Sequence, residues 1–164
     1  IIILMAIKIL SVDELKKVTQ KLKHKGKKIV LCHGVFDLLH IGHIEYFKEA
    51  KSKGDKLIVS ITSDEFVNKG PNRPTFNSRE RLEAISSLSV VDYVVLSSHS
   101  TAVNMIKELK PSFFCKGPDY KKKNNDITGE IKNEIKAVKS IGGKVIFTSG
   151  KTFSSSKLLN NLKI

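Results

Sequence analysis

Short apolar segments alternate with longer amphipathic segments along this chain. The apolar runs predict strands at residues 28–32, 56–62, 91–96, 112–116 and 144–148. The remaining segments predict helices at residues 11–23, 41–53, 78–88, 100–110 and 128–142, and a last helix that opens at Ser154. Strands that alternate with helices are typical of βαβ units. We therefore predict a Rossmann-like α/β fold, with a five-stranded parallel sheet and helices on both faces.

Polar residues and glycine mark the ends of these predicted helices. Ser11 is expected to cap the first helix through its hydroxyl, and Asn77 or Ser78 is expected to cap the third. Ser100 occupies the same kind of position before the fourth helix. Gly54 is expected to end the second helix, because glycine commonly follows a helix C-terminus.

The length and composition indicate one globular domain. The chain has 164 residues, 40% hydrophobic and 27% charged, and a chain of this length buries roughly 70% of its unfolded surface. Residues 1–27 are expected to form an N-terminal helical segment of the same domain as residues 28–164. The apolar start, residues 1–7, is too short to span a bilayer, so no membrane insertion is expected. Cys32 and Cys115 lie in apolar runs without metal-ligand spacing, which predicts buried thiols and a cytoplasmic location.

The net charge of +13 raises the question of a nucleic-acid partner. Lysines crowd residues 16–28, but no aromatic side chain is interleaved with them, as a nucleic-acid surface would require. A solvated helix face accounts for such a lysine run equally well. We therefore expect no nucleic-acid partner and assign the positive field to the attraction of a small polyanionic substrate.

Polar and unusual residues follow four of the five predicted strands. They lie at residues 33–43, 63–73, 116–120 and 149–156. In a parallel sheet, ligands bind outside the carboxyl ends of the strands, at the point where the strand order reverses. These four loops therefore predict one crevice, whose histidines, lysines, arginine and serines suit an anionic ligand.

The tetrad His40-Ile41-Gly42-His43 is the most informative part of this crevice. It opens a predicted helix, where the first backbone N–H groups have no partner within the helix and attract phosphate. Two imidazoles three residues apart can both donate toward a phosphate chain, and Gly42 permits close approach of the backbone. The alternative is that one imidazole has a structural role in the core or at the helix cap.

Several motifs in order give the chain a specific resemblance from about residue 28 onward. They are Gly34 to His43, Asn72-Arg73-Pro74, Arg79-Glu80-Arg81, residues 91–95, Lys116-Gly117-Pro118-Asp119-Tyr120 and Phe153-Ser154-Ser155-Ser156. The chain resembles the nucleotidyltransferases of the cytidylyltransferase-like superfamily, which carry a His-x-Gly-His motif. Within it, the likeness is greatest to the adenylyltransferases that act on heptose 1-phosphate. Its serine cluster and residues 150–153 depart from the usual family pattern, so the acceptor stays open.

The resemblance implies an enzyme that transfers a nucleoside monophosphate from a nucleoside triphosphate, ATP being favoured, to a sugar phosphate and releases pyrophosphate. It is implied to act in the synthesis of a lipopolysaccharide precursor. The implied catalytic residues are His40, His43, Lys69 and Arg73. The implied nucleotide-binding residues are Gly34, Val35, Phe36, Asp37, Gly42, Lys116, Gly117, Asp119, Tyr120, Ser154, Ser155 and Ser156. Arg81 and Asp64 are two further site residues.

Some of these residues have an alternative interpretation. Asp37 can accept backbone N–H groups of a loop or orient a substrate hydroxyl. Lys69 can follow a phosphate or remain a solvated loop lysine. Tyr120 can pack or stack, and the serine cluster can act as an anion site or cap a helix. His33, beside the motif, can contact a ligand or fill space under the loop.

The implied partners are small molecules. We expect Mg²⁺ to arrive with the nucleotide phosphates, because the histidines lack an acidic cluster at metal-ligand spacing. A homodimer and association with a sugar kinase are further expectations, since related domains occur joined to such a kinase. Two other functions stay open: a CTP-dependent cytidylyltransferase acting on glycerol 3-phosphate or another small phosphate, and a nucleotide-binding module without turnover.

Overall fold

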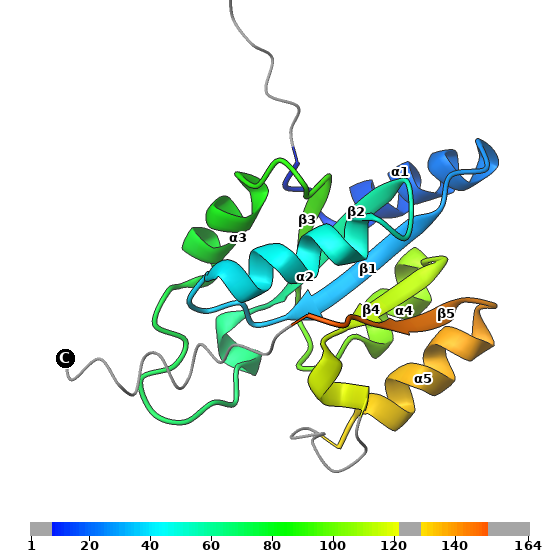
Figure 1. The fold of residues 1–164 in the computed structure, drawn as a ribbon. Helices are drawn as coiled ribbons and strands as arrows, with labels where there is room; N and C mark the ends of the chain where they lie inside the picture. The colour runs from blue at the N-terminus through cyan, green and yellow to red at the C-terminus, as the bar shows by residue number, and fades with distance from the viewer. Residues whose placement is uncertain (1–7, 122–128, 151–164) are drawn as a thin grey trace, which may run out of the picture.

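The computed structural model describes residues 8–121 and 129–150, and within them five strands form one parallel sheet. The strands are β1 (Ile29–Gly34), β2 (Lys56–Thr62), β3 (Tyr93–Ser97), β4 (Phe113–Lys116) and β5 (Lys144–Phe147). Their order in the sheet is β3-β2-β1-β4-β5, and every neighbouring pair is parallel (Figure 1). The predicted five-stranded parallel sheet is therefore confirmed.

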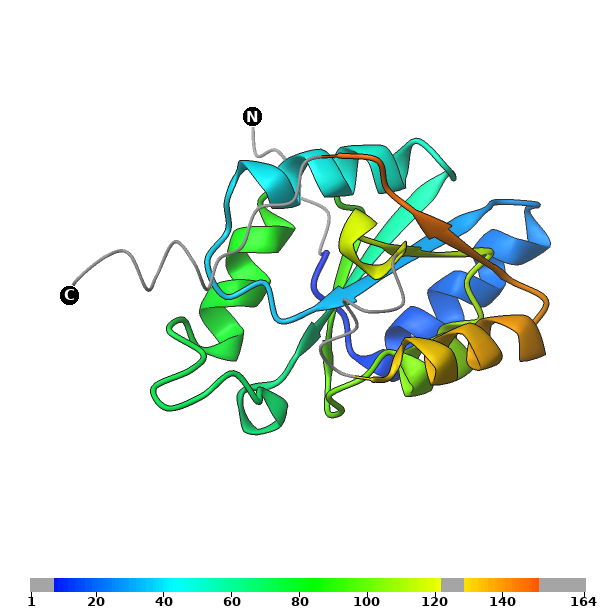
Figure 2. The same cartoon turned by 60° about the horizontal axis from the view of Figure 1, so that its bottom comes forward.

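Helices cover both faces of the sheet (Figures 1 and 2). One face packs against α1 (Val12–His24), α4 (Val103–Leu109) and α5 (Ile131–Ser140), and the other against α2 (Ile41–Lys51) and α3 (Ser78–Ser86). The strands alternate between the two cores: Leu31 lies in the first and Val30 in the second. No helix in the described part of the chain is both long and apolar enough to cross a membrane.

The capping predictions have mixed outcomes. Ser11 and Asn77 each form a capping box with a glutamate three residues later, as helix-start chemistry predicts. Ser100 does not cap α4. That helix begins at Val103, and the N–H of Ala102 donates to the Glu134 carboxylate of α5, at 3.2 Å. The cap therefore comes from another helix, which sequence proximity cannot indicate.

Gly54 has a different role from the one predicted. Helix α2 already ends at Lys51, and Gly54 is not among the glycines with positive φ. A Cβ atom at Gly54 would lie 2.8 Å from Cγ2 of Val30 and 2.9 Å from the carbonyl oxygen of Lys28. The glycine is therefore required by the close approach of the β1 backbone. The predicted helix starts at Thr128 and Ser154 lie outside the described residues.

The strand order determines where in the sheet the ligand crevice lies. From β1 the chain moves through β2 to β3 on one side, whereas β4 and β5 lie on the other side of β1. The order therefore reverses between β1 and β4, and the two strands end there in Gly34 and Lys116. Cys32 and Cys115 are register partners across this pair, and both are buried free thiols, as predicted.

We expect Gly54→Ala to lower the free energy of unfolding by about 1–3 kcal/mol, because the added methyl group overpacks a site closed by backbone atoms. Urea denaturation followed by circular dichroism measures this. Gly150→Ala is the control, since a Cβ there meets nothing within 4 Å. Equal stability of the two variants would contradict the close-approach explanation.

Candidate active site

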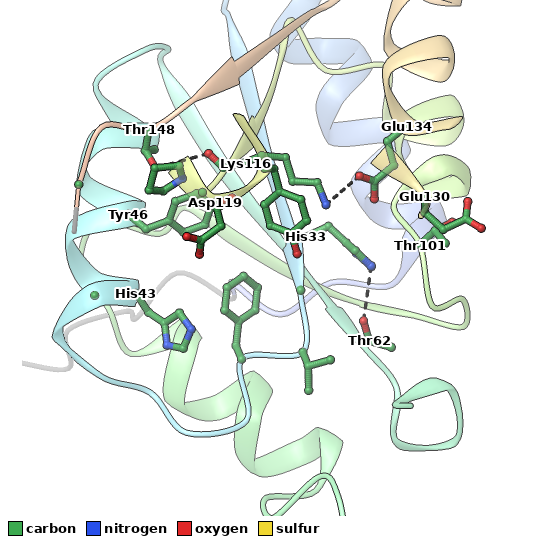
Figure 3. Close-up of a pocket in the computed structure, with 18 of the residues that line it drawn as sticks. His33, His43, Tyr46, Thr62, Thr101, Lys116, Asp119, Glu130, Glu134 and Thr148 are labelled. Atoms are coloured by element: carbon green, nitrogen blue, oxygen red, sulfur yellow. Dashed lines mark hydrogen bonds and ion pairs between the residues drawn. The ribbon is translucent and has the colours of Figure 1, made fainter. Parts of the chain in front are cut away.

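A cavity of about 280 Å³ lies at the carboxyl ends of β1 and β4, where the topology predicts a ligand (Figure 3). Most of the sequence-predicted site residues line it: Gly34, Val35, Phe36, His40, Gly42, His43, Lys69, Lys116, Gly117, Asp119 and Tyr120. Asp37, Asp64, Arg73 and Arg81 do not line it. The predicted serine site at residues 154–156 lies outside the described residues.

The two histidines of the tetrad stack on each other at the start of α2. Their ring centroids are 3.9 Å apart with an interplanar angle of 20°, and Phe36 packs edge-on against His43. Burial lowers the pKa of His43 to about 3, with His40 and Lys69 acting in the same direction. Burial also lowers the pKa of His40. Both rings are therefore neutral at pH 7, and Nδ1 of His43 is buried without a hydrogen-bond partner among the described residues.

Lys69 is exposed and lines the cavity from the loop between β2 and α3. The surrounding protein lowers the pKa of its ammonium group, and the positive charge of Arg73 adds to this effect. The Asp37 carboxylate opposes it. This loop therefore places the Lys69 ammonium group near His43, with Arg73 close enough to Lys69 to act on its pKa.

Asp37 joins the tetrad loop to the Arg-Pro loop (residues 72–74) and the residues that follow it. Its buried carboxylate accepts the N–H groups of Thr75 at 3.0 Å and Phe76 at 2.9 Å. Nε of Arg73 lies 3.4 Å from the same carboxylate. Of the two roles open to Asp37 in the sequence, the structure shows the backbone-accepting one. Arg73 is consequently held against the Asp37 carboxylate, and neither residue lines the cavity.

Arg81 is almost completely buried, with 2% of its surface exposed. Its five N–H groups contact the carbonyl oxygens of Val35, Thr62 and Phe76, the Asp64 carboxylate and the Ser78 hydroxyl. These acceptors belong to the tetrad loop, the end of β2 and the segment before α3. Arg81 and Asp64 therefore position the loops around the cavity, and their donors and acceptors are directed at the protein.

Lys116 ends β4 inside the cavity, where its charge is balanced. Its ammonium group lies 2.7 Å from the Glu134 carboxylate, and both side chains are less than 10% exposed. The ammonium also lies over the Tyr120 ring, 4.5 Å from the centroid. Glu134 thus links Lys116, and through it Tyr120, to the N–H of Ala102 at the start of α4. Sequence reasoning missed Glu134, because nothing local relates it to Lys116.

His33 lines the cavity while both of its ring nitrogens have partners. Nδ1 lies 2.6 Å from the Ser60 hydroxyl, and Nε2 lies 3.4 Å from the Thr62 hydroxyl. Burial lowers the pKa of His33 to about 3, and the nearby Lys116 charge contributes. Sequence reasoning also missed Thr101 and Glu130, which line the same cavity. The only feature of the sequence that indicated Thr101 as a site residue was its position after a predicted strand.

The described residues show no cluster of side chains that could hold a metal ion without a ligand. In residues 8–121 and 129–150, no three side chains of His, Cys, Asp or Glu gather as a group that could bind an ion. The motif carboxylate, Asp37, is already engaged by two backbone N–H groups and Arg73. A metal ion here would need further oxygen ligands from a bound phosphate chain.

Comparison with known proteins gives the site its context. The family model described as "Cytidylyltransferase-like" matches residues 31–161. The bifunctional protein HldE of Aliarcobacter butzleri is 40% identical over 152 residues, which cover 91% of this chain and 32% of that protein. The HldE protein of Campylobacter fetus is 37% identical over 158 residues, covering 95% and 31%. The chain thus spans about a third of the length of these relatives.

Two solved structures share the fold. The lipopolysaccharide core biosynthesis protein from Thermoplasma volcanium is 30% identical, has a TM-score of 0.64, and is matched over 77% of this chain and 100% of its own. Pantoate-beta-alanine ligase from Francisella tularensis, at 21% identity and a TM-score of 0.65, is matched over 94% and 73%. The second similarity concerns the fold alone.

We expect Arg81→Lys to lower the free energy of unfolding by about 2–4 kcal/mol, because an ammonium cannot satisfy five buried acceptors in a plane. Chemical denaturation measures the loss. Arg79→Lys is the matched control on the same helix: its side chain is 88% exposed and pairs only with Glu83 among the described ion pairs, so a change below about 0.5 kcal/mol is expected. Equal effects would contradict the positioning role of Arg81.

The low pKa values of His33 and His43 predict loss of stability in acid. Each histidine titrates near pH 6.5 when unfolded and near pH 3 when folded. Below pH 6.5 the unfolded chain binds more protons than the folded chain. Each histidine should therefore lower the free energy of unfolding by up to about 2 kcal/mol between pH 7 and pH 5. Denaturation at a series of pH values tests this.

His33→Gln and His43→Gln should each flatten that pH dependence. His24→Gln is the control, because His24 is exposed at the end of α1. An unchanged slope in both site variants would show that the acid sensitivity arises elsewhere.

Proposed function

The chain belongs to the cytidylyltransferase-like family of nucleotidyltransferases, and on this premise we propose that it transfers AMP from ATP to heptose 1-phosphate in the synthesis of a lipopolysaccharide precursor. The observation that carries the proposal is the stacked pair of neutral histidines that line a cavity together with Lys69. The HldE relatives and the lipopolysaccharide core biosynthesis structure support the choice of pathway.

The proposed reaction needs no nucleophilic side chain. An oxygen of the sugar phosphate attacks the α-phosphorus of ATP and forms a new P–O bond. The bond from the α-phosphorus to the oxygen bridging to the β-phosphorus breaks, and pyrophosphate leaves with that electron pair. The protein must align two anions that repel each other and stabilise charge on the phosphoryl oxygens.

His40 and His43 are suited to stabilise that charge. Nδ1 of His43 is buried without a hydrogen-bond partner among the described residues, so we expect it to gain a partner when ligand binds. An anion beside the pair favours protonation and raises the histidine pKa values from their low starting positions. The rings can thus act as neutral or protonated donors, and Lys69 adds a flexible positive charge that follows the departing pyrophosphate.

The remaining partners complete the proposal. Mg²⁺ is expected to be carried by the triphosphate, where it neutralises part of the phosphate charge. A sugar kinase is the class of enzyme that would supply the phosphorylated acceptor, and HldE carries the word "bifunctional" in its name. We place the reaction in the cytoplasm, and a homodimer remains a proposal to be tested by analytical ultracentrifugation.

A screen of pyrophosphate release tests the proposed substrates. ATP and CTP are each combined with heptose 1-phosphate and glycerol 3-phosphate. We expect release above background only with ATP and heptose 1-phosphate. Release with CTP and glycerol 3-phosphate would identify a polyol-phosphate cytidylyltransferase instead. Nucleotide binding without release in any combination would identify a binding module.

His43→Asn should reduce kcat about 10²–10³-fold, because it removes a donor that stabilises the transition state. The dissociation constant for ATP should change much less than kcat does. Circular dichroism checks that the variant is folded, and His24→Asn, at an exposed position on α1, serves as the matched control. Turnover within twofold of wild type would overturn the assigned role of His43.

A further inference from the structure

A buried ion pair between Lys116 and Glu134 differs from the other ion pairs of the protein. The Lys116 ammonium group lies 2.7 Å from the Glu134 carboxylate, and the two side chains are 9% and 3% exposed. Of the ion pairs that the structure describes, this is the one with both side chains below 10% exposed. A buried pair adds little net stability, because the cost of removing both charges from water offsets their attraction. Stability alone therefore does not account for the pair.

The Lys116 ammonium group is surrounded by protein. It lies over the ring of Tyr120, 4.5 Å from the centroid, and over the ring of Phe114, 5.3 Å from the centroid. Figure 3 shows the side chain of Lys116 extending from β4 toward Glu134 and away from His43. One carboxylate and two aromatic faces therefore share its charge, and the charge is not directed at His43.

The sheet and two helices fix the position of this ammonium group. The backbone carbonyl of Lys116 accepts the N–H of Thr148 at 2.9 Å, in the segment that follows β5. The Glu134 carboxylate accepts the N–H of Ala102 at 3.2 Å, so that α5 holds the start of α4. The charge of Lys116 is therefore placed by elements that belong to the core of the protein.

Tyr120 lies in a short segment between β4 and α5. It belongs to the 3₁₀ turn η2 (Pro118–Lys121), and its N–H donates to the carbonyl oxygen of Gly117 at 3.3 Å. The residue lines the cavity, and its ring contacts the Lys116 ammonium group. This cation–π contact thus connects a cavity-lining ring to the sheet. An aromatic ring in this place suits the flat base of a nucleotide, because bases stack on aromatic side chains.

We propose that Lys116 and Glu134 are positioning residues for nucleotide binding: Glu134 holds the Lys116 ammonium group, and this charge holds the Tyr120 ring against the nucleoside part of the nucleotide. Lys116 then acts through Tyr120 and makes no contact with the triphosphate. The inference rests on the proposed nucleotidyl transfer and adds to it how one nucleotide-binding ring is held in place.

A direct contact between Lys116 and the triphosphate is the alternative, and it predicts a different result. In that case Glu134 competes with the phosphates for the ammonium group, so Glu134→Gln should strengthen triphosphate binding or leave it unchanged. If Glu134 positions the ammonium group, the same substitution should weaken nucleotide binding, although it removes a negative charge from the cavity. The sign of the change therefore separates the two roles.

Three variants and two ligands test the proposal. Lys116→Met keeps an unbranched stem, Glu134→Gln keeps an acceptor for the Ala102 N–H, and the double variant leaves the net charge of the protein unchanged. Calorimetry measures the dissociation constants of α,β-methylene-ATP, which prevents turnover, and of tripolyphosphate, which has no nucleoside. We expect the constant for the ATP analogue to rise about tenfold in each variant, and no further in the double variant, because the two residues act as a unit. In the double variant, the constant for tripolyphosphate should stay within about twofold of wild type.

Kinetic constants and a control separate this role from a merely structural one. In the double variant the KM for ATP should rise about tenfold while kcat at saturating ATP stays within about threefold, because ground-state binding alone is lost. Lys56→Met removes the ammonium group of an ion pair with Asp92 outside the cavity, and should leave every constant within about twofold. Thermal unfolding checks the folding of each variant. If a single variant does not fold, the double variant still tests the proposal, because replacing both charges of a buried pair costs far less than removing one.

Two outcomes would overturn the inference while the proposed function stands. One is a double variant that binds the ATP analogue as tightly as the wild-type protein does. The other is a double variant that loses affinity for tripolyphosphate as much as for the ATP analogue, which would make Lys116 a direct phosphate ligand. Tighter binding of the ATP analogue by Glu134→Gln would lead to the same conclusion. If the wild-type protein binds no ATP analogue and releases no pyrophosphate, the proposed function itself fails, and the positioning role fails with it.

Discussion

The buried Arg81 guanidinium is the interaction on which the arrangement of the cavity most depends. It joins the loop of the histidine tetrad, the end of β2 and the segment before α3 through five hydrogen-bond acceptors. These segments come from distant parts of the chain. Without the guanidinium group, one carbonyl oxygen in each segment would lose a hydrogen-bond donor. A planar group with five fixed donors suits this position, because a single charge on a flexible stem cannot satisfy all of them.

The electrostatics of the site favour an anionic ligand. Burial and neighbouring positive charges lower the pKa values of His43 and Lys69, so both groups are less protonated than in water. A phosphate chain reverses this effect, since its negative charge stabilises each protonated form. Lys116 differs because Glu134 already balances its charge. The groups whose protonated forms a phosphate would stabilise are therefore the histidine pair and Lys69.

The sequence predicted most of the fold, because local patterns determine its elements. Apolar runs located all five strands, and Ser11 and Asn77 cap their helices with the side chains next to them in sequence. The failures involve distant partners: Glu134 caps α4 in place of Ser100, and Gly54 is needed by the backbone of β1. The cavity was predicted by the rule for parallel sheets. The sequence did not predict which residues line the cavity and which position its loops. Arg81 and Lys69 are distinguished only by their contacts in the folded structure.

Residues from helices on both faces of the sheet line the cavity. His40 and His43 stand at the start of α2, and Lys69 precedes α3, both helices of one face. Thr101 and Glu130 stand at the starts of α4 and α5, which cover the other face. Helices that follow parallel strands all begin at the same edge of the sheet, so their first residues meet there from both sides. The topology therefore brings residues from helices on both faces of the sheet to one cavity, although they are distant from one another in the sequence.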